Sequence, residues 1–108
     1  MTVYELANAC QFNILNLPEP DREINGAYIG DLLSWVMGRA ECDNVWITIM
    51  SNINVIAVAS LSDVSCVLLA EDVTLDNEVL STAKQKGINI LSTPMSAYDA
   101  AIKLSGMI

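Results

Sequence analysis

The sequence predicts an α/β protein, a three-layer α/β/α sandwich around a mostly parallel sheet. From Val45 onward, short apolar runs typical of buried strands alternate with helical patterns three times. This alternation is typical of right-handed crossovers between parallel strands, with helices covering the sheet. The run from Val64 to Ala70 is apolar except at Ser65, as in a strand buried on both faces. A chain of 108 residues has the length of one domain, so we expect residues 1–108 to form a single domain.

The first third of the chain is less regular. Thr2 and Glu5 form a capping-box pattern, which predicts a short helix that ends near Cys10. Apolar residues within 12–15 predict a strand, and the two prolines that follow exclude both helix and central strand. A second strand is expected over residues 24–29. We therefore expect this part of the chain to add a hairpin or a mixed edge to the sheet.

The centre of the chain, residues 46–61, predicts a buried strand that runs directly into a nearly all-apolar helix. Before it, we expect Asp31 to act as the N-cap of a helix over residues 32–39, since aspartate accepts hydrogen bonds from the free N–H groups of a helix start. Both helices have almost no polar face. We therefore expect part of their surface to be buried in a symmetric homodimer.

The last third follows the same alternation. An amphipathic helix is predicted over residues 76–86, with Gly87 in the position where helices stop. A short strand is predicted over residues 88–91. The capping pattern of Ser96 and Asp99 then predicts a final helix.

Composition excludes several kinds of partner. The chain has 5 basic and 13 acidic residues, for a formal net charge of -8, which repels nucleic acids and anionic membranes. No apolar run approaches the roughly 18 residues of a membrane-spanning helix, and the N-terminus lacks the pattern of a secretory signal, so we expect a cytoplasmic protein. The three cysteines form no Cys-x-x-Cys pair and are expected to be reduced, structural thiols.

The polar cluster Ser51, Asn52 and Asn54 is the first candidate binding site. These residues lie where the central strand meets its helix, and the first N–H groups of a helix lack intrahelical partners and attract anions. They offer neutral donors with no carboxylate in the same segment. The alternative interpretation is that Ser51 or Asn52 only caps the helix.

Three charged residues are further candidates. Asp21 and Arg22 could clamp a ligand, because a guanidinium binds phosphate or carboxylate in a bidentate manner. Alternatively, they form an ion pair that only shapes their loop. Asp31 could accept hydrogen bonds from a ribose hydroxyl or an adenine amine, or could serve only as a helix cap.

No catalytic or metal site is predicted. The chain contains no histidine, the usual general base, and a serine or cysteine nucleophile would lack its partner. The glycine-rich fingerprints of nucleotide-binding loops are also absent. We therefore expect no enzyme activity, no cofactor and no metal.

Three segments resemble a known family. Residues 21–26 read Asp-Arg-Glu-Ile-Asn-Gly, and residues 30–39 and 46–61 carry the apolar helices described above. The chain resembles a free-standing DRTGG domain, similar to the modules of some phosphotransacetylases and CBS-domain pyrophosphatases and, more distantly, to the N-terminal domain of HPr kinase. The Asp and Arg of the family's name motif are present, whereas its glycine follows after a longer, substituted spacing.

The resemblance implies a regulatory domain that is often dimeric and that accompanies adenine-nucleotide sensing. We therefore expect a non-catalytic homodimer that senses a small anionic ligand such as an adenine nucleotide. The alternative is a protein-interaction or assembly subunit without a small-molecule ligand. The candidate ligand-binding residues are Asp21, Arg22, Asp31, Ser51, Asn52 and Asn54.

Overall fold

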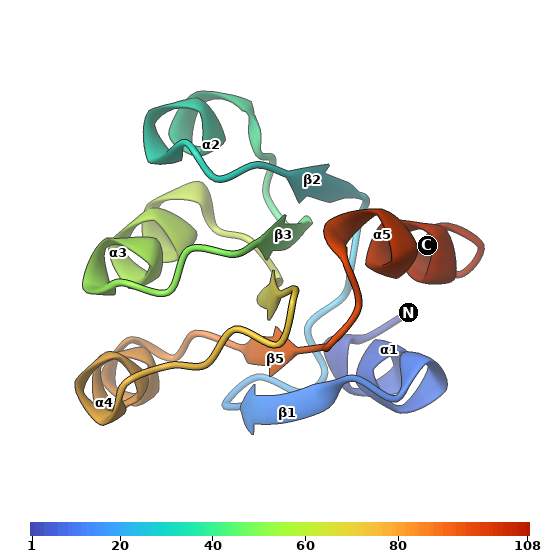
Figure 1. The fold of residues 1–108 in the computed structure, drawn as a ribbon, viewed down its shortest axis with the longest axis horizontal. Helices are drawn as coiled ribbons and strands as arrows, with labels where there is room; N and C mark the ends of the chain where they lie inside the picture. Colours follow the sequence, from blue (N-terminus) through green and yellow to red (C-terminus); the bar gives the residue numbers. More distant parts are fainter.

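The computed structural model describes all of residues 1–108 as an α/β/α sandwich, which confirms the predicted fold class. Five helices and five strands alternate along most of the chain (Figure 1). In chain order they are α1 (Val3–Cys10), β1 (Asn13–Asn16), β2 (Ala27–Ile29), α2 (Leu33–Arg39), β3 (Val45–Thr48), α3 (Ile53–Ser62), β4 (Cys66–Leu69), α4 (Asn77–Lys86), β5 (Ile90–Ser92) and α5 (Ala97–Ser105).

The five strands form one sheet in the order β1-β5-β4-β3-β2. Strands β2 to β5 are parallel, and β1 pairs antiparallel with β5. Of the two arrangements expected for the first third of the chain, the mixed edge is therefore present. A hairpin is not, because β1 and β2 lie at opposite edges.

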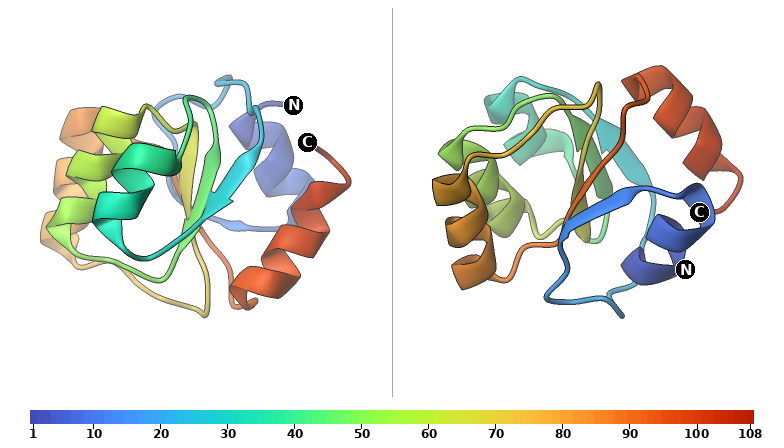
Figure 2. Two further views of the ribbon diagram at one scale, coloured as in Figure 1. Left: turned by 90° about the horizontal axis from the view of Figure 1, so that it is seen from above. Right: turned by 60° about the horizontal axis from the view of Figure 1, so that its bottom comes forward.

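The helices form two layers, one on each face of the sheet. Strands β2 to β5 follow one another in space as in sequence, and connections of one hand between such neighbours place their helices on one face. Accordingly, α2, α3 and α4 cover one face, while α1 and α5 cover the other (Figure 2).

Alternate residues of the central strands supply the two halves of the core. Val45 and Ile47 of β3 belong to the cluster under α1 and α5, whereas Trp46 belongs to the cluster under α2, α3 and α4. All three side chains are fully buried. The indole N–H of Trp46 donates to the carbonyl oxygen of Gly30 at 2.9 Å, so the bulky ring enters the core without an unpaired donor.

Helix starts confirm two of the expected caps and correct the third. Thr2 forms a complete capping box with Glu5, and the Ser96 hydroxyl accepts from the N–H of Asp99. Asp31 does not cap α2, whose N-cap position is held by Leu32 without a side-chain hydrogen bond. The carboxylate of Asp31 instead accepts from two donors at the end of the neighbouring strand β3.

The strand expected over residues 24–29 is shorter than predicted and begins at Ala27. Ile24 packs against the core from outside the sheet, and the N–H of Asn25 donates to the carbonyl oxygen of Asp43. Gly26 has a φ of +81°, a conformation that glycine adopts without steric cost. The chain therefore turns at Gly26 before it enters the sheet.

No helix of the structure has the length and apolar character needed to cross a bilayer.

We expect Leu68→Ala in the central strand β4 to lower the free energy of unfolding by about 2–5 kcal/mol, because it leaves a cavity in a close-packed core. The Leu68 side chain is 0% exposed. Urea denaturation followed by far-UV circular dichroism measures the change.

The matched control is Ile102→Ala on α5, since the Ile102 side chain is 54% exposed. This substitution should change stability by no more than about 0.5 kcal/mol. Equal losses for the two variants would contradict the placement of β4 at the centre of the sheet.

Candidate functional site

The six candidate residues lie at two opposite ends of the sheet. Asp31 follows β2, and Ser51, Asn52 and Asn54 follow β3, so these four lie at the carboxyl ends of parallel strands. Asp21 and Arg22 lie at the amino ends of the strands, because Arg22 contacts the residues that precede β3 and β4. The structure therefore brings four of the candidates together and places the other two elsewhere.

At the carboxyl end, side chains already pair two of the N–H groups that follow β3. Asp31 Oδ1 accepts from the N–H of Ile49 at 3.0 Å and from the Thr48 hydroxyl at 2.8 Å. The Thr48 hydroxyl in turn accepts from the N–H of Met50 at 3.1 Å. Asp31 therefore connects the end of β2 to the end of β3, the role it has in place of capping α2.

The start of α3 leaves three consecutive N–H groups free. Asn52 is the N-cap, and its side-chain oxygen accepts from the N–H of Asn54 at 2.9 Å. The N–H groups of Ser51, Asn52 and Ile53 have no partner within the protein. Free donors at the positive end of a helix dipole favour an anion. Asn52 thus acts as a cap, and three donors are left over beside it.

The side chains around these donors are mostly neutral. Asn52 and Asn54 are exposed, and Ser51 is half-buried. Asp31 is the charged neighbour, and only its Oδ1 forms hydrogen bonds within the protein. Its second oxygen can accept from a hydroxyl or an amine, although its charge repels a phosphate placed against it.

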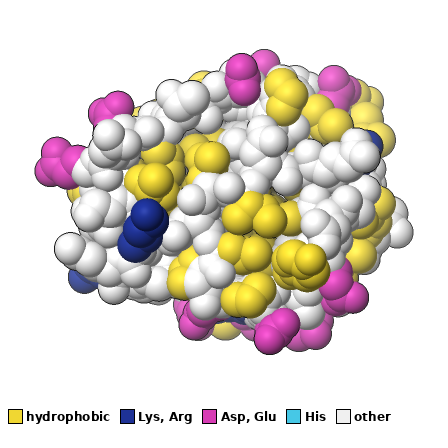
Figure 3. Space-filling model, turned by 90° about the horizontal axis from the view of Figure 1, so that it is seen from below, with side chains coloured by type: hydrophobic (Ala, Val, Ile, Leu, Met, Phe, Trp, Pro, Cys, Tyr) yellow, Lys and Arg dark blue, Asp and Glu magenta, His cyan; other side chains and the backbone are white.

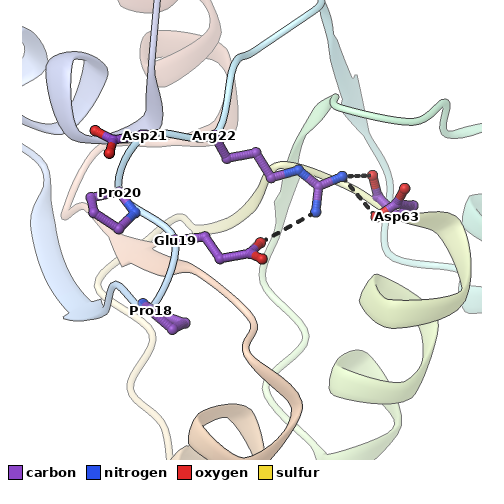
Figure 4. Close-up of a pocket in the computed structure, with 6 residues that line it drawn as sticks. All are labelled: Pro18, Glu19, Pro20, Asp21, Arg22 and Asp63. Carbon is purple, nitrogen blue, oxygen red and sulfur yellow. Dashed lines mark hydrogen bonds and ion pairs between the residues drawn. The ribbon is translucent and has the colours of Figure 1, made fainter.

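At the opposite end of the sheet, Arg22 is surrounded by carboxylates. Its Nη2 lies 2.9 Å from Asp43 Oδ1 and 2.7 Å from Asp63 Oδ1. It also donates to the Asp63 carbonyl oxygen, and Glu19 lies 3.6 Å from Nη1. In Figure 4, Asp21 points away from this guanidinium. Arg22 therefore forms ion pairs with three acidic residues, none of which is Asp21.

This ion-pair network shifts the protonation of its members. Partial burial opposes the charge of Arg22, but hydrogen bonds to Asp63 and Asp43 outweigh it and raise the pKa of the guanidinium. The hydrogen bond from Arg22 lowers the pKa of Asp63. The Cys42 thiol donates to Asp63 Oδ2 at 3.3 Å, and this bond raises the pKa of Cys42. The raised pKa disfavours the thiolate of Cys42, which is exposed, whereas Cys10 and Cys66 are buried.

Residues 17–26, which we call the connector, run along the amino end of the sheet from β1 at one edge to β2 at the other. Asn89, next to β5, exchanges hydrogen bonds with the backbone of Glu19. Arg22 joins the connector to the residues before β3 and β4, and Asn44 donates to the carbonyl oxygen of Asn25 at 2.6 Å. The segment that carries the family's name motif is thus attached to the start of each central strand.

Three surface depressions are present, and the largest is not at the carboxyl ends of the strands. It has a volume of about 590 Å³ around Arg22 and is lined by the connector and Asp63 (Figure 4). The guanidinium of Arg22 in this depression already forms ion pairs with carboxylates of the protein. A second, of about 380 Å³, lies between α3 and α4. A third, of about 310 Å³, lies between β1, the start of α4 and residues 72–75. The start of α3 differs from these three depressions in its free N–H donors and not in the depth of its surface.

Sequence reasoning missed the partners of Arg22. Asp43 and Asp63 are 20 or more positions away from it, and both adopt a left-handed conformation, with φ of +66° and +55°. Aspartate tolerates this conformation better than most residues. An aspartate directly after an apolar helix was the available signal for Asp63, but only the fold could show where Arg22 lies. No group of three or more Cys, Asp or Glu residues is arranged to hold a metal ion.

Comparison with known proteins gives a family match and a similar fold. The family model of the DRTGG domain matches residues 5–107. No curated protein matches the chain. Among solved structures, the chain is similar to the CBS and DRTGG domains of the regulatory region of Clostridium perfringens pyrophosphatase, complexed with the activator diadenosine tetraphosphate.

The likeness to that structure has a TM-score of 0.71 at 15% sequence identity, and it covers 95% of this chain and 45% of that chain. At this identity the comparison shows a shared fold. The chain spans less than half the length of the pyrophosphatase region that it matches.

We expect Arg22→Ala to lower the free energy of unfolding by about 1–2 kcal/mol at pH 7, because it removes charge-assisted hydrogen bonds. This loss is modest because Asp63 and Asp43 are 63% and 40% exposed, and solvent weakens such pairs. The control is Arg39→Ala, which removes an exposed arginine that stacks on Trp35 and should cost about 0.5–1 kcal/mol.

The pH dependence of the stability difference between the wild type and Arg22→Ala shows whether the ion pair with Asp63 causes it. Since Arg22 lowers the pKa of Asp63 in the folded state, the unfolded state takes up a proton first as pH falls. The advantage of the wild type over Arg22→Ala should be complete above about pH 5 and shrink through the lowered pKa of Asp63. A difference that stays constant from pH 7 to pH 3 would show that lost packing, rather than the ion pair, destabilises the variant.

Proposed function

The chain belongs to the DRTGG domain family, and from this premise we propose that it is a cytoplasmic, non-catalytic regulatory domain. In this proposal it binds a small anionic ligand of the adenine-nucleotide type at the carboxyl ends of β2 and β3. It acts as a homodimer, so that binding changes the assembly or activity of a partner.

The three free N–H groups of Ser51, Asn52 and Ile53 carry the proposal. They are consecutive, they begin a ten-residue helix, and no basic or acidic side chain is in the same segment. Ligands of open α/β sheets bind outside the carboxyl ends of the strands. A phosphate at this point would accept from the free donors and meet the positive end of the α3 dipole.

The adenine-nucleotide type is supported by two observations. The regulatory region of the similar pyrophosphatase is complexed with a dinucleoside polyphosphate, diadenosine tetraphosphate. In this chain, the second oxygen of Asp31 is a free acceptor next to the proposed phosphate site, suited to a ribose hydroxyl or an adenine amine. The site offers donors and one acceptor without a nucleophile and adjacent base, which favours binding over catalysis.

The test is Asn52→Asp, a substitution that preserves the helix cap and adds a negative charge. Aspartate caps helices as well as asparagine does, so stability should stay within about 0.5 kcal/mol of the wild type. A ligand at 100 times its Kd stabilises a protein by about 2.7 kcal/mol. We expect thermal shifts of the wild type with diadenosine tetraphosphate or ATP, and their loss in Asn52→Asp.

The matched control is Ser96→Asp, which makes the same kind of change at the N-cap of α5 on the other face. It should leave the thermal shift intact. An unchanged shift in Asn52→Asp, or no shift of the wild type with either nucleotide, would contradict binding at the start of α3.

Exposed apolar side chains support the homodimer. On α2 and just before it, Leu32, Trp35 and Met37 are 57%, 53% and 52% exposed, and on α3 Leu61 is 72% exposed. Helices α2 and α3 lie in one layer (Figure 1), and Leu61 lies on the side of α3 that faces α4, so the apolar side chains are spread over this layer. Apolar area of this kind is typical of a surface that a second subunit covers. The same observation favours the second candidate function, an assembly subunit that docks on a different protein.

We expect Trp35→Lys to convert the dimer to a monomer, because it places a charge in the proposed apolar interface, where it would lose its hydration. Light scattering coupled to size-exclusion chromatography measures the mass. Tyr98→Lys is the control, since Tyr98 is 73% exposed but lies on α5, on the opposite face. A monomeric wild type at all concentrations would argue against the homodimer and favour docking on a different protein.

A further inference from the structure

The depression of about 310 Å³ between β1, α4 and residues 72–75 has features that the proposed function does not use. It opens on the edge of the sheet formed by β1, at a distance along the sheet from the start of α3, with β4 and β5 in between. Figure 3 shows the molecule from below, the side on which β1 lies in Figure 1, with hydrophobic side chains reaching the surface at several places on this face. The pocket is at the lower end of the roughly 300–1,000 Å³ range of small-molecule sites.

Ser92 is the most informative residue of this pocket. It is 7% exposed, and it lies two positions after the core residue Ile90 on the same face of β5. Its hydroxyl forms no hydrogen bond within the protein, yet it is not sealed off, because the one fully enclosed unpaired hydroxyl belongs to Ser62. A buried hydroxyl without a partner costs about 1–3 kcal/mol. Because the hydroxyl is reachable from the pocket, water or a ligand in the pocket can supply its partner.

Asn13 provides a second unpaired group beside it. Asn13 and Ser92 are directly opposite each other in the antiparallel pair of β1 and β5, so their side chains are on one face and about 4.5–5.5 Å apart at Cβ. Asn13 is exposed, its amide forms no hydrogen bond within the protein, and both residues line the pocket. Together they present two donors and acceptors side by side.

The remaining walls are preformed and mostly apolar. Leu15, Val73, Leu75 and Leu80 supply its apolar lining. Two backbone hydrogen bonds hold the bend at Asp72. The N–H of Asp72 donates to the carbonyl oxygen of Thr93 at 3.0 Å, and the N–H of Val73 donates to the carbonyl oxygen of Ala70 at 3.2 Å. The bend that places Asp72 at the pocket is therefore held by the backbone of the protein itself.

These features select one class of ligand. No lysine or arginine lines the pocket, and Asp72 does, so a phosphate or carboxylate is disfavoured and N–H donors are favoured. The paired amide and hydroxyl match the alternating donors and acceptors on the edge of a heterocycle, and the leucines match its faces. We propose that this pocket binds an uncharged, amine-bearing heterocycle of nucleobase to nucleoside size, independently of the anion site at α3.

The experiment measures binding of adenosine, an uncharged nucleoside, by NMR titration of the wild-type protein and by calorimetry of variants. We expect the backbone amide signals of Thr74 and Ser92 to shift with saturation. Ser92→Ala should weaken binding about three- to tenfold, the value of one hydrogen bond. Leu80→Trp, at a half-buried position of α4, should abolish binding by filling the pocket.

Ser62→Ala is the matched control, because it removes an unpaired hydroxyl that does not line the pocket; it should bind adenosine as the wild type does. Saturation of none of adenosine, guanosine and cytidine would overturn the inference. Adenosine binding that survives Leu80→Trp would also overturn it. Binding that is lost in Asn52→Asp but kept in Leu80→Trp would assign the nucleoside to α3, which supports the proposed function and refutes the second pocket.

Discussion

The ion pairs of Arg22 help to hold the connector, the segment that joins the two edges of the sheet. β1 and β2 follow each other in the sequence but lie at opposite edges, so the connector must run along the whole amino end of the sheet. Arg22, at 22% exposure, joins it to Asp43 and Asp63, and charge-assisted hydrogen bonds are the strongest that side chains offer. The family's name motif lies in this segment, which gives Asp21 to Gly26 a structural setting.

The attachment of the connector at the amino end makes the two ends of the sheet chemically different. At the amino end, the side chains of Asn44 and Asn89 and the Arg22 guanidinium are already paired. At the carboxyl end, the donors at the start of α3, the second oxygen of Asp31 and the Ser92 hydroxyl have no partner in the protein. A ligand can form hydrogen bonds with these unpaired groups, and both proposed sites therefore lie at the carboxyl end. Ligands of open α/β sheets generally bind at this end.

Much of the fold was predictable because the strands and helices carry local patterns. The apolar run of β4 indicated a strand covered on both faces, and the capping patterns at Thr2 and Ser96 marked two helix starts. Of the two proposed sites, only the one at the start of α3 could be proposed from the sequence. Asn52 and its neighbours lie where a strand meets a helix, a junction that local sequence shows, whereas the cross-strand pair of Asn13 and Ser92 is separated by most of the chain.

By itself, the sequence determined the order of elements, the buried faces and the free donors at α3, since periodicity and capping act over a few residues. Only the tertiary structure decided which side chains meet. Asp31 bonds to Thr48 and Ile49 instead of capping α2, and Arg22 pairs with acids far along the chain. Such choices depend on which partners the sheet brings within about 3 Å, the length of a hydrogen bond, and no local pattern encodes that distance.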